Sequence, residues 1–197
     1  MKKRVAILIS GRGSNMTALI NSMTGDHPAR PCVVISTTPK VQGLRNALER
    51  NTPTVTLNCG EYDRASESFE RDLDIQLKRA NAELICLAGF MRILSADFVG
   101  KWQGRILNIH PSLLPKFKGL NTHARVLAAG ETVHGCTVHQ VTAKLDDGPI
   151  LGQLKLTVHK HDTAVTLADR VLKLEHVLYP VVLRHFIAGD LNQAALN

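Results

Sequence analysis

Short apolar runs alternate with segments of helical periodicity through the first 110 residues of the chain. The strand-length runs are "RVAILIS", "PCVVIST", "TPTVTLN", "AELICLAGF" and "GRILNIH". Most of them are apolar at consecutive positions, a pattern typical of strands that are covered on both faces. The alternation therefore predicts right-handed βαβ units and an α/β fold with a single doubly wound, mostly parallel sheet.

Three segments between these runs have helical spacing. Residues 14–23 place apolar side chains three and four positions apart, with Ser14 available as the N-cap. Residues 41–50 form the second expected helix, and residues 63–80 form the longest, with one apolar stripe. Each helix joins two strands, as a parallel sheet requires.

The pattern of apolar and polar residues changes after residue 130. Residues 134–159 alternate like two strands around a "DDG" turn, which predicts an antiparallel excursion of the sheet. Residues 162–189 predict a long C-terminal helix, with Pro180 as a candidate kink or break. Repeats and low-complexity linkers are absent from the sequence, so we expect one domain over residues 1–197.

Composition excludes several classes of protein. The apolar stretches are interrupted or shorter than the roughly 18 residues of a membrane span. The N-terminal apolar run is about six residues, below the roughly 7–15 of a signal-peptide core, which favours a cytoplasmic protein. The four cysteines, Cys32, Cys59, Cys86 and Cys136, have no paired spacing, so we expect reduced thiols and no metal.

The charge balance favours anionic ligands. Lys and Arg number 24 against 17 acidic residues, which gives a formal net charge of +7. Such a balance suits phosphates or polyglutamate tails. The basic residues are dispersed and the aromatic content is only 4%, so the sequence has no stacking pattern for nucleic acid.

The first polar cluster is "SGRGSN", residues 10–15, between a strand and a helix. Amide groups at a helix N-terminus bind anions, so Gly13, Ser14 and Asn15 are candidates to hold one phosphate. The loop is neither a dinucleotide fingerprint nor a Walker A loop, because Met16 replaces the last glycine and no GK[ST] follows. An ordinary tight turn fits the same residues.

The second cluster is "LAGFMRIL", residues 87–94, after the fourth expected strand. Gly89 would allow close backbone approach, and Met91, Ile93 and Leu94 would form an apolar wall for a flat ring. Apolar residues beside a strand are also common in a protein core, so both interpretations stay open.

The third cluster is "NIHPSLLPKFKG", where Asn108 and His110 close an apolar strand. Residues two apart on a strand point to the same side, so an amide and an imidazole would face one spot. Such a pair can stabilise an oxyanion and transfer a proton. The alternative is a polar strand end at which Pro111 stops the pairing.

The fourth cluster is "LDDGP", residues 145–149. Asp-Gly is a strong turn signal, but a carboxylate close to His110 would also orient the imidazole and favour its protonated form. Cys136 has no evident activating base in the sequence. His134 and His139 lie on opposite faces of an expected strand, which argues against a metal site there.

Together with "HGCTVH", these motifs resemble the folate-dependent formyltransferases in order and spacing over nearly the whole chain. The "GxGSN" loop resembles the branch that acts on glycinamide ribonucleotide. The resemblance implies a Rossmann-like formyltransferase fold and 10-formyltetrahydrofolate as co-substrate. It implies formyl transfer to the amine of N1-(5-phospho-D-ribosyl)glycinamide in purine (IMP) biosynthesis.

The resemblance also implies roles for individual residues. Asn108, His110 and Asp146 would be catalytic, and the first two would stabilise the tetrahedral intermediate while Asp146 keeps His110 protonated. Gly13, Ser14 and Asn15 would bind the phosphate, and Glu175 the ribose. The folate would contact Arg64, Met91, Arg92, Ile93, Leu94 and Asn108, with the pterin at the backbone of residues 142–147. The nucleotide half would cover about residues 1–100 and the catalytic half about 101–190.

Two positions depart from the pattern of these formyltransferases. Asp147 stands where relatives often carry a small residue, and Asn121 where a histidine is frequent. The expected partners are the two substrates, without nucleic acid or membrane, in a monomer or homodimer. A formyltransferase or hydrolase with another acceptor remains an alternative, as does a non-catalytic module that binds a nucleotide phosphate.

Overall fold

The computed structural model describes residues 1–62 and 67–191. The strands follow the order β3-β2-β1-β4-β5-β6-β7 in one sheet. Contacts divide the chain into two compact units, Met1–Leu107 and Asn108–Asn197. The predicted α/β class with a mostly parallel sheet is confirmed, whereas the single-domain organisation stays a prediction.

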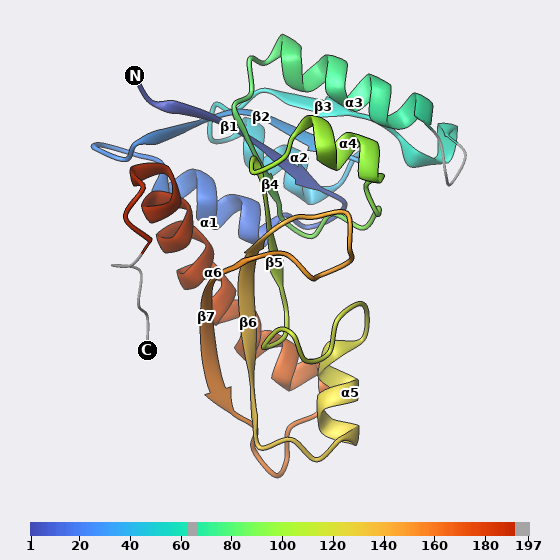
Figure 1. Ribbon diagram of the computed structural model, residues 1–197, viewed down its shortest axis with the longest axis vertical. Helices are drawn as coiled ribbons and strands as arrows, with labels where there is room; N and C mark the ends of the chain where they lie inside the picture. The colour runs from blue at the N-terminus through green and yellow to red at the C-terminus, as the bar shows by residue number, and fades with distance from the viewer. Residues whose placement is uncertain (63–66, 192–197) are drawn as a thin grey trace. The chain divides into compact units, whose positions relative to one another are not determined.

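The N-terminal unit is built on parallel strands (Figure 1). β1 (Lys3–Ile9) lies between β2 (Ala29–Ser36) and β4 (Leu84–Leu87), and β3 (Thr54–Thr56) pairs with β2. The last five residues of β1 have no exposed surface, as its continuous apolar run predicts. The chain reverses its direction across the sheet between β1 and β4, which is the position where open α/β sheets bind ligands.

The helices of this unit connect the parallel strands. They are α1 (Ser14–Ser22), α2 (Gln42–Leu48), α3 (Glu67–Arg79) and α4 (Ala96–Lys101), with a 3-10 turn, η1, at Cys59–Glu61. The sequence pattern does not predict α4. Its six residues are too few to show a period. Ser95 is its N-cap, and the Ser95 hydroxyl accepts from the backbone N–H of Phe98.

In the C-terminal unit, β6 (Val133–Gln140) and β7 (Ile150–Thr157) pair antiparallel around the "DDG" turn, as predicted. α5 (Thr122–Ala128) was not predicted, because seven residues give little periodicity. The long helix α6 (Ala164–Ala188) packs on both strands (Figure 1). β5 (Ile106–His110) ends at the start of this unit.

The predicted long helix is confirmed, and of the two possibilities for Pro180, a kink or a break, the structure excludes the break, because α6 continues through it. Proline removes one backbone donor and usually kinks or ends a helix. Here the neighbouring residues Leu178, Tyr179, Val182 and Leu183 are all fully buried. Burial of four large side chains on both sides of the proline offsets the lost hydrogen bond.

Candidate active site

The loop between β1 and α1 contains the predicted phosphate site. Gly13 has φ +70°, and a Cβ there would lie 3.0 Å from Gly43 Cα. The first helical hydrogen bond joins Thr17 N–H to Gly13 C=O at 2.9 Å. The preceding amide groups therefore have no acceptor within the helix, which is the arrangement that binds an anion.

The structure corrects the predicted cap of this helix. Gly13, not Ser14, occupies the N-cap position, and Ser14 is the first helical residue. The left-handed backbone of Gly13 makes the turn into α1, so a capping side chain is not needed to start the helix. Asn15 is buried and Ser14 is half-buried.

Ser10 links this loop to the segment that follows β4. Its backbone N–H donates to Gly89 C=O at 3.0 Å, and its Oγ accepts from Met91 N–H at 3.0 Å. Thr37 Oγ1 donates to the same hydroxyl at 2.7 Å. The predicted phosphate loop and the predicted folate segment are therefore held together within the N-terminal unit.

The predicted folate segment has a mixed surface. Met91 and Ile93 are 70% and 78% exposed, so two large apolar side chains lie open beside the loop. Leu94 is buried in the core. The guanidinium of Arg92 stacks 4.3 Å from the centre of the Phe69 ring. Arg64, predicted to meet the folate tail, lies outside the described residues.

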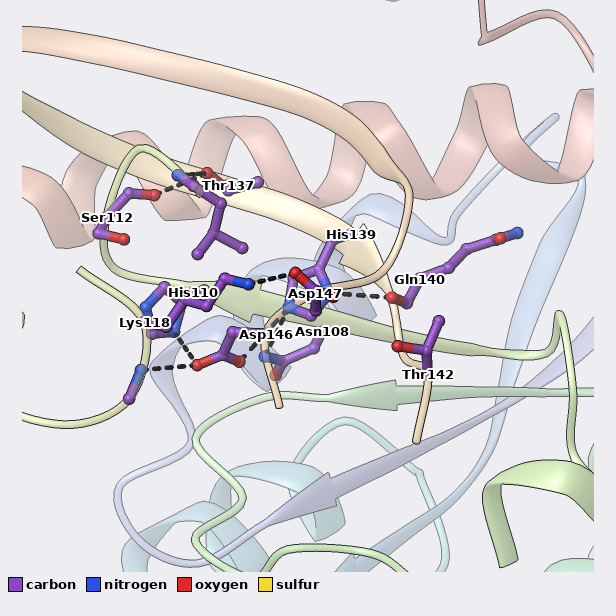
Figure 2. A network of polar contacts seen from close by, with 12 residues as sticks. Asn108, His110, Ser112, Lys118, Thr137, His139, Gln140, Thr142, Asp146 and Asp147 are labelled. Carbon is purple, nitrogen blue, oxygen red and sulfur yellow. Dashed lines mark hydrogen bonds and ion pairs between the residues drawn. The ribbon is translucent and has the colours of Figure 1, made fainter. Parts of the chain in front are cut away.

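The second candidate centre lies wholly in the C-terminal unit. Asn108 and His110 are at the carboxyl end of β5, and Asp146 is in the turn between β6 and β7. His110 Nδ1 lies 3.4 Å from Asp146 Oδ2. Figure 2 shows the three side chains turned toward one another with His139 beside them.

The surroundings of His110 fix which ring nitrogen exchanges a proton. Nε2 lies 3.0 Å from the carbonyl oxygen of Phe117, which can only accept a hydrogen bond. Nε2 therefore holds a proton, and Nδ1 is the nitrogen that gains or loses one. Since Nδ1 faces the carboxylate of Asp146, an imidazolium would donate on both sides.

The backbone conformation of the turn and a hydrogen bond from Gly119 fix the position of Asp146. Its backbone is left-handed, with φ +48°, a conformation that Asp tolerates better than most residues. Its Oδ2 also accepts from the backbone N–H of Gly119 at 2.8 Å. Gly148 has no room for a side chain, because a Cβ would lie 1.8 Å from the carbonyl oxygen of Gln140.

Sequence reasoning missed the role of His139, which it considered only as a metal ligand. His139 Nδ1 lies 2.9 Å from the carbonyl oxygen of Gln140 and therefore donates. The pKa of His139 is lowered, chiefly by burial, so the neutral ring presents the Nε2 lone pair. This nitrogen accepts from Asn108 Nδ2 at 3.2 Å, which fixes the amide and leaves its second N–H to donate elsewhere.

A hydroxyl anchors the loop that follows His110. Thr137 Oγ1 donates to Ser112 C=O at 2.6 Å and accepts from Leu114 N–H at 3.1 Å. Gln153 Nε2 donates to the same hydroxyl at 2.8 Å and to Leu114 C=O at 2.9 Å. The start of the loop is therefore bound to the antiparallel pair of strands.

A second pair of histidines joins α5 to β6. His123 Nδ1 and His134 Nε2 are 3.0 Å apart, so the two rings share one proton. Burial lowers the pKa of His134 to about 4, with a further contribution from His123. Burial lowers the pKa of both histidines, which favours the form in which both rings are neutral.

This pair predicts a loss of stability in mild acid. The pKa of His134 is below its unfolded value of about 6.5, so its contribution is complete above that pH and is lost toward pH 4. We expect the unfolding free energy to fall by up to about 3 kcal/mol over this range. Denaturant titrations at several pH values would give the unfolding free energy of the wild type and of His134→Gln. This free energy should fall less steeply with decreasing pH in the variant; an equal pH dependence would contradict the assignment.

Three further residues from the sequence analysis, Glu175, Cys136 and Asn121, lie in the C-terminal unit. Glu175 is buried on α6, and its charge adds to burial in raising the pKa of Cys136 to about 12. Cys136 therefore remains a protonated thiol rather than a nucleophile. Asn121 precedes α5 with φ +56°, which explains an asparagine at this position.

Residues 1–62 and 67–191 contain no group of three or more His, Cys, Asp or Glu arranged for a metal ion. Among the helices of these residues, none combines the length and apolar character that a membrane span requires.

Comparison with known proteins decides the family. A model of the formyl transferase domain matches residues 3–183. The chain belongs to the formyl transferase family. Its members include phosphoribosylglycinamide formyltransferase from Escherichia coli, which is 40% identical over 188 residues covering 95% of this chain and 88% of that protein.

A longer relative and a protein of solved structure have higher sequence identity to this chain. The trifunctional purine biosynthetic protein adenosine-3 of Gallus gallus is 47% identical over 95% of this chain, which spans only 19% of that protein. The crystal structure of phosphoribosylglycinamide formyltransferase from Brucella melitensis has a TM-score of 0.90. It is 46% identical and covers 96% of this chain and 97% of its own.

Proposed function

We propose that this formyl transferase moves the formyl group of 10-formyltetrahydrofolate to the amine of N1-(5-phospho-D-ribosyl)glycinamide in purine biosynthesis. The convergence of Asn108, His110 and Asp146 around one spot supports this most directly. The names of the similar proteins from Escherichia coli and Brucella melitensis support the choice of acceptor.

The proposed reaction begins when the glycinamide amine attacks the formyl carbon. The new C–N bond turns the formyl oxygen into an oxyanion, and the free N–H of Asn108 donates to it. The protonated His110, paired with Asp146, stabilises the same charge. The C–N10 bond then breaks, the amine loses a proton and N10 of the folate gains one, which releases tetrahydrofolate.

Substrate binding is assigned to the other predicted positions. Gly13, Ser14 and Asn15 hold the phosphate at the N-terminus of α1. Glu175 accepts from the ribose hydroxyls. Met91 and Ile93, which are exposed, flank the folate ring with Arg92 and Leu94, and Arg64 meets the folate tail. The backbone of residues 142–147 holds the pterin.

The partners of the protein are its two substrates in this proposal, without a metal, a nucleic acid or a membrane. The protein acts as a monomer or homodimer. Its cytoplasmic location stays a prediction from the sequence.

Gly13→Ala should weaken binding of the phosphorylated substrate. The added methyl would meet Gly43 Cα at 3.0 Å and force a left-handed backbone on alanine, so the loop must shift. We expect the KM for glycinamide ribonucleotide to rise about tenfold or more, because about 1.4 kcal/mol of binding is lost per tenfold. Steady-state kinetics with each substrate varied would measure this. An unchanged KM in a folded variant would exclude the loop as the phosphate site.

The acceptor can be tested directly. Production of tetrahydrofolate from 10-formyltetrahydrofolate would be measured with glycinamide ribonucleotide, with a sugar amine, with aminoacylated tRNA and with water alone. The proposal expects rapid turnover only with glycinamide ribonucleotide. Turnover with water alone would indicate a hydrolase, and phosphate binding without turnover would indicate a non-catalytic module.

A further inference from the structure

We infer that Lys118 and Asp147 are a positioning pair whose contact holds the segment Phe117–Gly119 against His110 and Asp146. This inference rests on the proposed function, since it concerns how that reaction's groups are held. It also gives a role to Asp147, the middle residue of the "DDG" turn.

Three consecutive residues contact the candidate centre or the turn beside it, each through a different group. The carbonyl of Phe117 lies 3.0 Å from His110 Nε2, and the N–H of Gly119 donates to Asp146 Oδ2 at 2.8 Å. Between them, the ammonium of Lys118 donates to Asp147 Oδ1 (Figure 2). The backbone of the segment therefore contacts the two ionisable side chains, His110 and Asp146, and the Lys118 side chain contacts the turn beside them.

Arg125 fixes this segment from α5. Its Nη1 donates to Lys118 C=O at 2.6 Å and to Leu120 C=O at 3.3 Å. Its guanidinium also lies 5.5 Å from the centre of the Phe117 ring. The segment thus has a set shape, and its distance from the turn that contains Asp146 depends on the Gly119 hydrogen bond and on the contact of Lys118 with Asp147.

The pair of Lys118 and Asp147 closes that distance. The side chains are 36% and 41% exposed, so the contact adds little to global stability. Lys118 lowers the pKa of Asp147 by hydrogen bonding and by charge, so the Asp147 carboxylate is ionised at neutral pH. Because Asp147 is bonded to Asp146, the contact sets where the Asp146 carboxylate lies.

Four variants test the pair: Lys118→Met, Asp147→Asn, both together, and the exchange Lys118→Asp with Asp147→Lys. An exposed ion pair changes an equilibrium or rate constant by a factor of about three to five. Each single variant should therefore lower kcat by about that factor. The KM for glycinamide ribonucleotide should stay unchanged. The double variant should be no slower than either single one, and the exchange should recover at least half of the lost rate.

Lys116→Met is the matched control. Lys116 lies on the same loop, and its Nζ pairs with Glu131 at 2.8 Å. Within residues 1–62 and 67–191, this pair includes neither His110 nor Asp146. Its removal should leave kcat unchanged. Added salt should lower kcat of the wild type toward that of Asp147→Asn, because screening weakens exposed pairs.

The ring N–H signal of His110 gives a readout that needs no substrate. In the wild type the Nε2 proton is bound to Phe117 C=O, so its proton resonance should exchange slowly with water, and Asp147→Asn should speed this exchange. Unchanged exchange in both single variants would overturn the inference, as would kcat losses that multiply in the double variant. A wild type without formyl transfer would refute the proposed function instead, and the exchange rates would still decide on the pair.

Discussion

Asn108→Ala is expected to lower kcat for formyl transfer about a hundredfold or more. Removal of one oxyanion donor costs about 3–4 kcal/mol of transition-state stabilisation. The amide of Asn108 is held by His139 Nε2 at 3.2 Å, so its second N–H is preorganised and does not have to reorient when the transition state forms. Rapid-quench measurement of the chemical step would separate this loss from product release.

The effect should appear in kcat rather than in substrate affinity, since the oxyanion exists only after attack. Thermal unfolding of the variant must resemble that of the wild type, because alanine also leaves the His139 ring without its donor. A folded Asn108→Ala protein with near-normal turnover would refute the assigned role.

Asp146→Asn is expected to reduce kcat about a hundredfold as well. Truncating one member of a buried charge pair costs about 2–5 kcal/mol, and Asp146 is only 9% exposed. The asparagine oxygen can still accept from Gly119 N–H, so the turn should keep its shape. The loss would then reflect the missing negative charge beside His110.

Asp169→Asn provides a matched control for this change. Asp169 is an exposed acid on α6, so the same acid-to-amide substitution should leave kcat unchanged. Steady-state kinetics of both variants, with circular dichroism to verify folding, would measure the difference. Equal kcat values in Asp146→Asn and the wild type would remove the carboxylate from the mechanism.

The strands of the parallel sheet could be predicted because burial on both faces leaves a continuous apolar run, as in β1 and β4. Short helices left no such signal, which is why α4 and α5 were missed. Local rules also failed where packing decided the outcome: α6 continues through Pro180, and Gly13 rather than Ser14 starts α1.

The same limits apply to the candidate site. The period of two on a strand was enough to put Asn108 and His110 on one side. The proximity of Asp146 depends on the β6–β7 turn, so it came only from the family resemblance. The contacts of Phe117 and His139 with the centre, and of Lys118 with Asp147, arise from tertiary structure and leave no mark in local spacing.

Transfer of a labelled formyl group tests the account most directly. The enzyme would be mixed with [13C-formyl]-10-formyltetrahydrofolate and glycinamide ribonucleotide, and the product would be followed by NMR. If the proposed reaction is correct, the label will appear on the glycinamide nitrogen with an equal amount of tetrahydrofolate. Label recovered as formate, or left on the folate, would contradict it.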